Sequence, residues 1–199
     1  MNRLRFALAL MIAAAGIAGV SAQKPPAKPT QKPPAGAAQK ASAPAGPVLV
    51  FETAKGAFEI ETYPDEAPKS VAQVVDLVRH GFYRGLRFHW VQPGVIQIGD
   101  PTSRDMSRMD SWGNAGSGRS VGVAEISKRK FEKGTVGFAY REGQKPTAAD
   151  SQIFILRAPN PALNGKYAMI GHVTSGMNVV EKIEKPDMVK MAYVKGEQK

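Results

Sequence analysis

Cysteine is absent from the 199 residues of this sequence. Its absence excludes disulfides, thiolate metal ligands, a cysteine nucleophile and a cysteine-linked lipid anchor. A domain without disulfides must rest on its hydrophobic core, and a chain of this length can supply one. The three histidines, His80, His89 and His172, lack metal-ligand spacing, so we expect no metal site.

The sequence also lacks an apolar run long enough for a typical membrane span of about 20 residues. Its longest run, residues 6–20, follows two arginines and precedes small residues that end at Ala22. That order is typical of a secretory signal peptide. We expect residues 1–22 to be cleaved after Ala22, giving an exported, periplasmic protein whose mature form does not insert in the membrane. An uncleaved membrane anchor is the alternative.

Acidic residues are few beside basic ones, and the formal net charge is +10. Six of these charges belong to Arg3, Arg5 and four lysines within residues 23–47, so the remainder is only mildly basic. No expected helix carries a dense basic stripe alternating with aromatic residues. We therefore expect no nucleic-acid partner.

Residues 23–47 contain the pentad QKPPA twice and are rich in proline, lysine and alanine. Nothing in this segment can build a core, and its composition is typical of an extended, solvated linker. We interpret it as a spacer that precedes a domain at residues 48–199. Affinity of its lysines for an anionic envelope surface is the alternative.

The domain shows mainly the patterns of strands. Two β-type runs around Lys55-Gly56 predict a hairpin with one solvated face, and valines at helical spacing after Pro68 predict a helix that stops at Gly81. The expected strands are 48–53, 57–63, 86–92, 95–100, 135–140, 151–157, 167–173 and 188–194, with a second helix at 177–183. This content predicts a mainly β protein, a closed eight-stranded antiparallel barrel capped by two helices. Residues 101–133 are expected to form long loops.

Five motifs occur in order between Val48 and Val194. They are Ala67-Pro68-Lys69-Ser70-Val71-Ala72, Phe82-Tyr83-Arg84-Gly85-Leu86-Arg87-Phe88-His89, Ser151-Gln152-Ile153-Phe154-Ile155, Leu163-Asn164-Gly165-Lys166-Tyr167 with Ile170-Gly171-His172-Val173, and Gly176-Met177-Asn178-Val179-Val180. Together they resemble the cyclophilin-type peptidyl-prolyl isomerases. The resemblance implies a cyclophilin-like fold whose surface groove binds proline-containing segments of exported proteins, without a cofactor, in a monomer.

The resemblance also implies the residues of the site. The expected catalytic residues are His89, Gln97, Trp90 and Arg141, and the expected substrate-binding residues are Ile96, Ala139, Tyr140, Gln152, Phe154, Leu163 and Tyr167. Ile96, Phe154 and Leu163 are expected to form one apolar cup for the proline ring. The alternatives are a purely structural, hydrogen-bonded His89, and ordinary core positions for Phe154 and Leu163.

One expected residue is missing. In the family, an arginine directly after the Phe-His pair donates to the prolyl nitrogen, and Trp90 stands there in this sequence. An indole N–H is a single neutral donor, without the charge or the fork of a guanidinium. We therefore expect an isomerase with reduced turnover, in which Arg141 is a candidate surrogate. The alternatives are a non-catalytic peptide-binding module and a barrel carrier or structural envelope protein.

The segment from Pro93 to Asp100 is one residue shorter than the family pattern. If the missing residue precedes Gln97, that glutamine faces the groove, whereas an alignment without a gap turns Ile98 toward it. Successive strand residues point to opposite faces, so one residue decides between them. The Gly99-Asp100 ending favours Gln97.

Overall fold

The computed structural model describes residues 46–141 and 143–197. The expected signal peptide, 1–22, lies outside the described residues, as does the expected linker, 23–47, apart from its last two residues. Both assignments remain predictions. No helix within the described residues is both long and apolar enough to cross a membrane.

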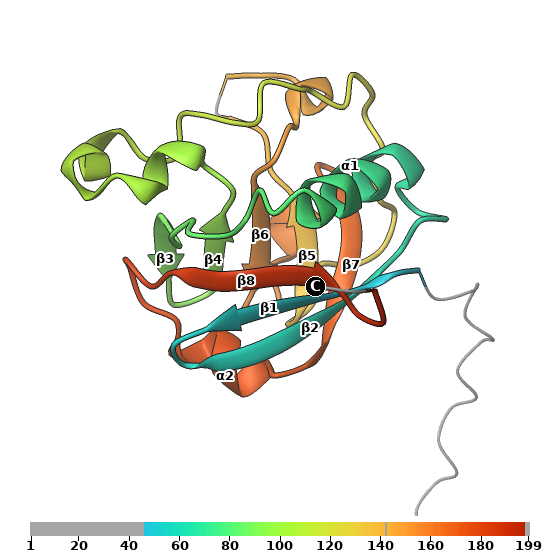
Figure 1. Ribbon diagram of the computed structural model, residues 1–199. Coiled ribbons are helices and arrows are strands. Elements are labelled where there is room, and N and C mark those ends of the chain that lie inside the picture. Colours follow the sequence, from blue (N-terminus) through green and yellow to red (C-terminus); the bar gives the residue numbers. More distant parts are fainter. Residues whose placement is uncertain (1–45, 142, 198–199) are drawn as a thin grey trace, which may run out of the picture. The chain divides into compact units, whose positions relative to one another are not determined.

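Eight antiparallel strands form one strongly curved sheet (Figure 1). In chain order the strands are β1 (Val48–Thr53), β2 (Gly56–Thr62), β3 (Trp90–Gln92), β4 (Val95–Ile98), β5 (Thr135–Phe138), β6 (Ile153–Leu156), β7 (Ala168–Ser175) and β8 (Val189–Val194). Across the sheet their order is β3-β4-β6-β5-β7-β2-β1-β8. The predicted mainly β architecture with eight strands is confirmed.

The sheet is open, because its two edge strands, β3 and β8, do not pair with each other. Residues 86–88, the start of the expected strand 86–92, instead form a loop with a single β-bridge, from Arg87 to Met188. The N–H groups of Gly85 and Phe88 donate to the carbonyls of Val189 (2.8 Å) and Asp187 (2.9 Å). Of the expected strand 86–92, only Trp90–Gln92 (β3) is a strand, and it does not pair with β8. The prediction of a closed barrel is therefore wrong.

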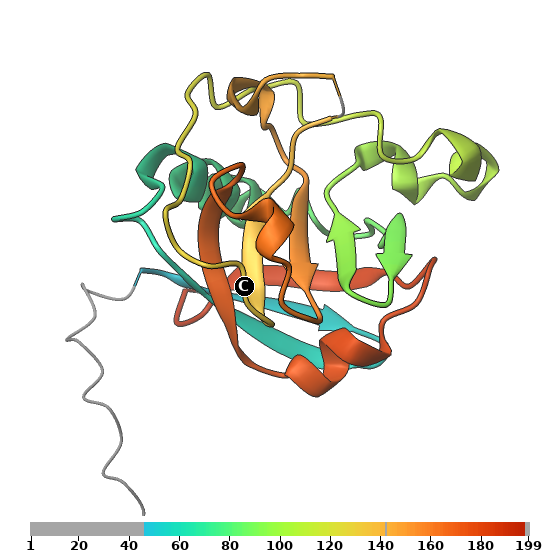
Figure 2. The same ribbon diagram turned by 180° about the vertical axis from the view of Figure 1, so that it is seen from behind.

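Two α-helices lie at opposite ends of the curved sheet, as the two views in Figures 1 and 2 show. Helix α1 (Pro68–Arg79) has its proline in the first turn, where the missing N–H costs little. It buries one face against the sheet through Val71, Val74, Val75 and Val78. Helix α2 (Met177–Lys182) is a short second helix, as predicted.

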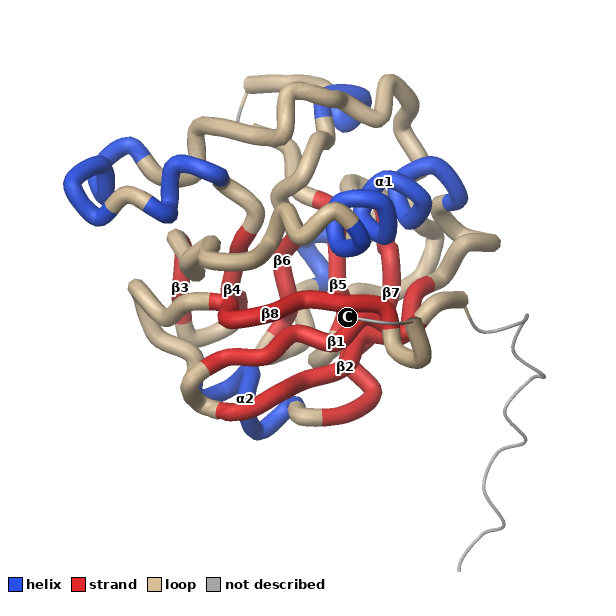
Figure 3. Tube along the Cα trace, viewed as in Figure 1, coloured by secondary structure: helices blue, strands red, loops and turns tan. Residues whose placement is uncertain are grey.

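Four short 3₁₀ helices were not predicted (Figure 3). They are η1 (Pro101–Arg104), η2 (Met106–Ser111), η3 (Pro146–Ala148) and η4 (Pro161–Leu163). The first two lie in the connection from β4 to β5, and the rest of that connection contains neither helix nor strand. Such long connections on a rigid sheet are common sites of binding surfaces.

The two faces of β6 serve different apolar clusters. Ile153 and Ile155 belong to the main core under α1. Phe154 and Leu156 point the opposite way, as alternation along a strand requires, and join a smaller cluster with Phe131, Ala139 and Met169. The outer face of the sheet therefore carries its own apolar floor, and the candidate site lies on this floor.

Candidate functional site

A groove of about 990 Å³ lies over the smaller apolar cluster. Its walls come from β3, β4 and β6, from the residues after β5, from the loop after η2 and from the segment around η4. Ten of the eleven residues expected to form the site line it: His89, Trp90, Gln97, Ala139, Tyr140, Arg141, Gln152, Phe154, Leu163 and Tyr167. Residues far apart in the sequence are thus brought together as the resemblance implied.

Ile96 is the exception. Its side chain is fully buried in the main core, whereas its neighbours on β4, Val95 and Gln97, line the groove. The assignment of Ile96 to the proline cup is therefore wrong, because alternation along the strand points it to the other face. The same alternation decides the alignment, since Ile98 is also buried in the core and Gln97 faces the groove.

Phe154 forms the floor of the groove and lies against a glycine on the neighbouring strand. Gly137 pairs with Phe154 in the β5–β6 register. A Cβ atom on Gly137 would lie only 2.1 Å from Cζ of the Phe154 ring. The bare glycine backbone therefore gives the ring the space that it occupies.

An aromatic series continues from this floor up one wall. The Phe154 ring meets the Tyr167 ring edge-on, with their centroids 5.3 Å apart. Tyr167 in turn stacks on Tyr140 at 4.8 Å. Burial raises the pKa of Tyr167, so its phenol stays protonated at neutral pH. With Leu163 at the end of η4, these rings form an apolar cup bordered by phenol groups.

Two glutamines form a hydrogen-bonded pair in the groove. Nε2 of Gln152 donates to the carbonyls of Gly113 (2.9 Å) and Ala115 (2.8 Å). These two bonds fix which end of the Gln152 amide faces Gln97. Its Oε1 therefore accepts from Nε2 of Gln97, at 2.7 Å. The chain of bonds fixes the orientation of both amides and holds the Gln97 amide at the groove.

His89 is 6% exposed and lines the groove. Within the described residues, neither ring nitrogen has a hydrogen-bond partner. Burial lowers the pKa of His89 to about 4, although the Asp100 carboxylate acts in the opposite direction. At neutral pH the ring is therefore uncharged, and it supplies no cationic donor.

Trp90 and Arg141 line different parts of the groove. The indole of Trp90 is 52% exposed, and Trp90 pairs with Gln97 in the β3–β4 register. Arg141 follows β5, and its Nη1 donates to the carbonyl of Asn114 at 2.7 Å. Arg141 therefore brings a fixed cation to the groove rim, which the indole of Trp90 does not.

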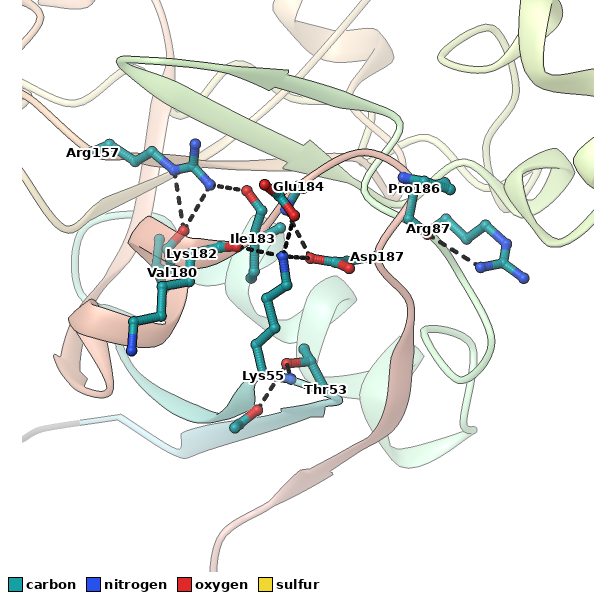
Figure 4. Close-up of polar contacts among 11 residues, drawn as sticks. Thr53, Lys55, Arg87, Arg157, Val180, Lys182, Ile183, Glu184, Pro186 and Asp187 are labelled. Carbon is teal, nitrogen blue, oxygen red and sulfur yellow. Dashed lines mark hydrogen bonds and ion pairs between the residues drawn. The ribbon is translucent and has the colours of Figure 1, made fainter.

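Arg87 lies away from the groove. Its Nη1 donates to the carbonyl of Pro186 at 3.1 Å, as Figure 4 shows. The same view includes Lys55, whose Nζ lies 2.6 Å from a carboxylate oxygen of Glu184 and 3.0 Å from one of Asp187. The contacts of Lys55 tie the connection between α2 and β8 to the β1–β2 hairpin, and neither Lys55 nor Arg87 lines the groove.

Sequence reasoning missed six lining residues: Val95, Trp112, Gly113, Asn114, Gln144 and Asn160. The loop after η2 is held through the Asp100 carboxylate, which accepts from the N–H groups of Gly113 and Ala115. Burial opposes the ionisation of Asp100, but hydrogen bonds to the carboxylate hold its pKa below the usual value. These contacts are non-local, and the glycine-rich composition indicated only a loop.

Comparisons with known proteins agree with this geometry. The family model described as cyclophilin type peptidyl-prolyl cis-trans isomerase/CLD matches residues 48–197. The chain is 41% identical over 155 residues to a probable peptidyl-prolyl cis-trans isomerase of Brucella abortus, covering 76% of this chain and 78% of that protein. It is 34% identical over 144 residues to the peptidyl-prolyl cis-trans isomerase-like 1 of Aspergillus fumigatus, covering 68% and 80%.

Two solved structures share the fold at lower sequence identity. The cyclophilin type peptidyl-prolyl cis-trans isomerase of Cryptosporidium parvum matches with a TM-score of 0.66 at 24% identity, covering 76% of this chain and 99% of that one. A cyclophilin from Hirschia baltica matches with a TM-score of 0.63 at 20% identity, covering 76% and 75%. At these identities the likeness concerns the fold alone.

Proposed function

The chain belongs to the cyclophilin-type peptidyl-prolyl cis-trans isomerase family, and we propose that its groove isomerises Xaa-Pro bonds in proteins exported from the cytoplasm. The observation that carries the proposal is the apolar floor of Phe154 beside the anchored amide of Gln97. A proline ring fits such a floor, and an oriented amide can hold the neighbouring peptide backbone.

The reaction makes and breaks no covalent bond. Its barrier of about 18–20 kcal/mol comes from the resonance of the amide. A catalyst must therefore bind the twisted amide better than either planar isomer. The prolyl nitrogen becomes a good acceptor only when the amide twists, so a donor directed at that nitrogen favours the transition state. No nucleophile or cofactor is required.

We assign the residues to these tasks as follows. Phe154, Leu163 and Tyr167 hold the proline ring, and Gln97 holds the adjacent backbone. Gln152 fixes the amide of Gln97 rather than acting on the substrate directly. Ala139 and Tyr140, just beyond β5, complete the wall against which the substrate lies.

This site has no charged hydrogen-bond donor at position 90 for the prolyl nitrogen. Trp90 offers a neutral indole at the position where the family resemblance implies an arginine, and neutral donors form weaker hydrogen bonds than charged ones. We propose that turnover is reduced for this reason and that Arg141 supplies the residual donor from the rim. The neutral ring of His89 lines the groove beside Gln152 without contributing charge.

The tryptophan at position 90, where the family resemblance implies an arginine, also supports a second candidate function. A groove that keeps its apolar floor and its glutamine pair but lacks a charged donor would bind proline segments without isomerising them. Such a non-catalytic module differs from the isomerase in turnover and not in affinity. A direct rate measurement therefore separates the two functions.

The place of action is part of the proposal. The basic, apolar and small-residue order of residues 1–22 supports export and cleavage after Ala22, so the clients would be exported proteins bound by a monomer in the periplasm. Mass spectrometry of the protein recovered from the periplasm tests the cleavage. A mass that begins at Gln23 supports the proposal, and a retained Met1 contradicts it.

A protease-coupled assay with a proline peptide tests the activity itself. The wild-type protein should accelerate isomerisation above the uncatalysed rate. Phe154→Ala should lose peptide binding, with a cost of about 3–5 kcal/mol on the scale of a truncated buried aromatic. Leu156→Ala is the matched control, because Leu156 packs in the same cluster without lining the groove. Peptide binding without acceleration would favour the non-catalytic module.

A further inference from the structure

Trp90 is unusual in its exposure. Three large apolar side chains of the described residues are exposed: Trp90 at 52%, Met106 at 44% and Met188 at 37%. Trp90 is the most exposed of them, and of the three it alone lines the groove. Large aromatic side chains are often the anchors of binding surfaces. The exposed indole of Trp90 is therefore a candidate contact for a bound peptide.

That role is not the packing of β3. Val91, the next residue on the strand, faces the other way and packs against the main core. Trp90 belongs to neither of the two apolar clusters that the described residues form. Because Val91 anchors the short edge strand, the indole of Trp90 is left free to contact whatever occupies the groove.

The sheet register sets how far Trp90 lies from the proline floor. Trp90 pairs with Gln97, and Gln97 pairs with Phe154, so the three side chains form a row on one face of β3, β4 and β6. Adjacent strands are about 4.8 Å apart, which places the backbones at the two ends of this row roughly 10 Å apart.

A bound peptide can span this distance in a few residues. An extended chain rises about 3.3 Å per residue, so a proline on Phe154 places a residue about one to three positions away near the indole. The Gln97 amide between the two rings is already held by Gln152. The contact at Trp90 is therefore separate from the contact that holds the proline.

We propose that Trp90 selects the substrates of this isomerase by binding an aromatic or large apolar side chain within about three residues of the proline. This inference rests on the proposed function and adds a substrate class to it. The indole contacts a side chain away from the twisting bond, so the contact is equally strong in the planar and the twisted amide. Such uniform binding lowers KM and leaves kcat unchanged.

The experiment uses the full chain and a polyalanine peptide with one central proline. A single phenylalanine is moved through the three positions on each side of the proline, the range set by the row length. KM and kcat come from exchange NMR, and Kd comes from calorimetry. The protein variants are Trp90→Ala, Trp90→Phe and, as the control, Met106→Ala, which removes an exposed apolar side chain outside the groove.

For the wild type, phenylalanine at one or more of these positions should lower Kd and KM about two- to tenfold, the range of an aromatic pair contact. Trp90→Ala should abolish this preference, so that within this variant the phenylalanine peptides and the all-alanine peptide give the same Kd and KM. Trp90→Phe should keep most of the preference, and Met106→Ala all of it. A circular dichroism spectrum checks that each variant is folded.

An aromatic preference that persists in Trp90→Ala, or is absent in the wild type, would overturn the inference. A different outcome contradicts the proposed function: neither the wild type nor any variant isomerises any of the peptides. In that case Kd alone still decides whether Trp90 selects the bound peptide.

Discussion

Phe154 and Gly137 are direct partners on neighbouring strands, and the Phe154 ring occupies the space that a side chain on Gly137 would fill. The floor of the groove is thus a property of two residues. Phe154 supplies the apolar surface, and Gly137 lets the ring lie where a proline can reach it.

Gly137→Ala should displace the Phe154 ring. Overpacking of this kind costs about 1–3 kcal/mol of stability, and the affinity for proline peptides should fall because the floor moves. Thermal unfolding and peptide titration check both effects. Gly94→Ala is the matched control, since a Cβ on Gly94 meets no atom within 4 Å. Unchanged affinity in Gly137→Ala would mean that the ring position is not important for binding.

Gln152→Glu keeps the shape of the side chain but removes the two N–H groups that bind the carbonyls of Gly113 and Ala115. The Gln97 amide then loses its fixed orientation, and kcat/KM should fall about tenfold or more, a change of about 1.4 kcal/mol. Asn160→Asp places the same charge elsewhere on the groove, keeps the bond that this side chain accepts from the Ala162 N–H, and should have a much smaller effect. Equal losses in the two variants would indicate a general effect of charge.

The neutral state of His89 predicts an acid-sensitive stability. The pKa of His89 is about 4 in the folded protein and about 6.5 in an unfolded chain, so the unfolded state takes up the proton first. The stability from this group is present above about pH 6.5 and is lost as the pH falls from about 6.5 toward about 4. The slope approaches about 1.4 kcal/mol per pH unit.

Urea unfolding at pH 7 and pH 5 measures this effect. His89→Gln should flatten the pH dependence relative to the wild type, whatever its stability at pH 7. If the wild type and His89→Gln lose the same free energy of unfolding between pH 7 and pH 5, His89 does not titrate in this way.

Arg141→Ala tests whether a cation on the rim replaces the missing arginine. If Arg141 is the donor, the variant loses nearly all of the wild-type turnover while peptide affinity changes little. If the site has no surrogate, wild-type turnover is already low and Arg141→Ala barely alters it. Pre-steady-state isomerisation and calorimetry on the same samples separate turnover from affinity.

Local patterns predicted much of the fold. The hairpin of β1 and β2 and the valine face of α1 follow from periodicity and turn residues within short segments. The closed barrel was wrong because residues 85–88 form a loop beside β8, a tertiary contact that local periodicity does not encode.

The site was predictable mainly where a motif carried it. Gln97 and Phe154 were placed through the resemblance, whereas Ile96 was assigned to the wrong face of the strand. The wall formed by Trp112 to Asn114 depends on hydrogen bonds that the Asp100 carboxylate accepts and the Gln152 amide donates, and both residues lie in distant segments. A sequence pattern within the loop gives no indication of these bonds.

The central claim is that this groove isomerises Xaa-Pro bonds and that its turnover is limited by the residue at position 90. The most direct test is kcat/KM of Trp90→Arg relative to the wild-type protein, measured in one isomerisation assay with the all-alanine proline peptide. One preorganised donor typically contributes about 100- to 1000-fold, so we predict measurable wild-type catalysis and a gain of at least about tenfold in the variant. Fast wild-type catalysis that Trp90→Arg does not improve would contradict the account.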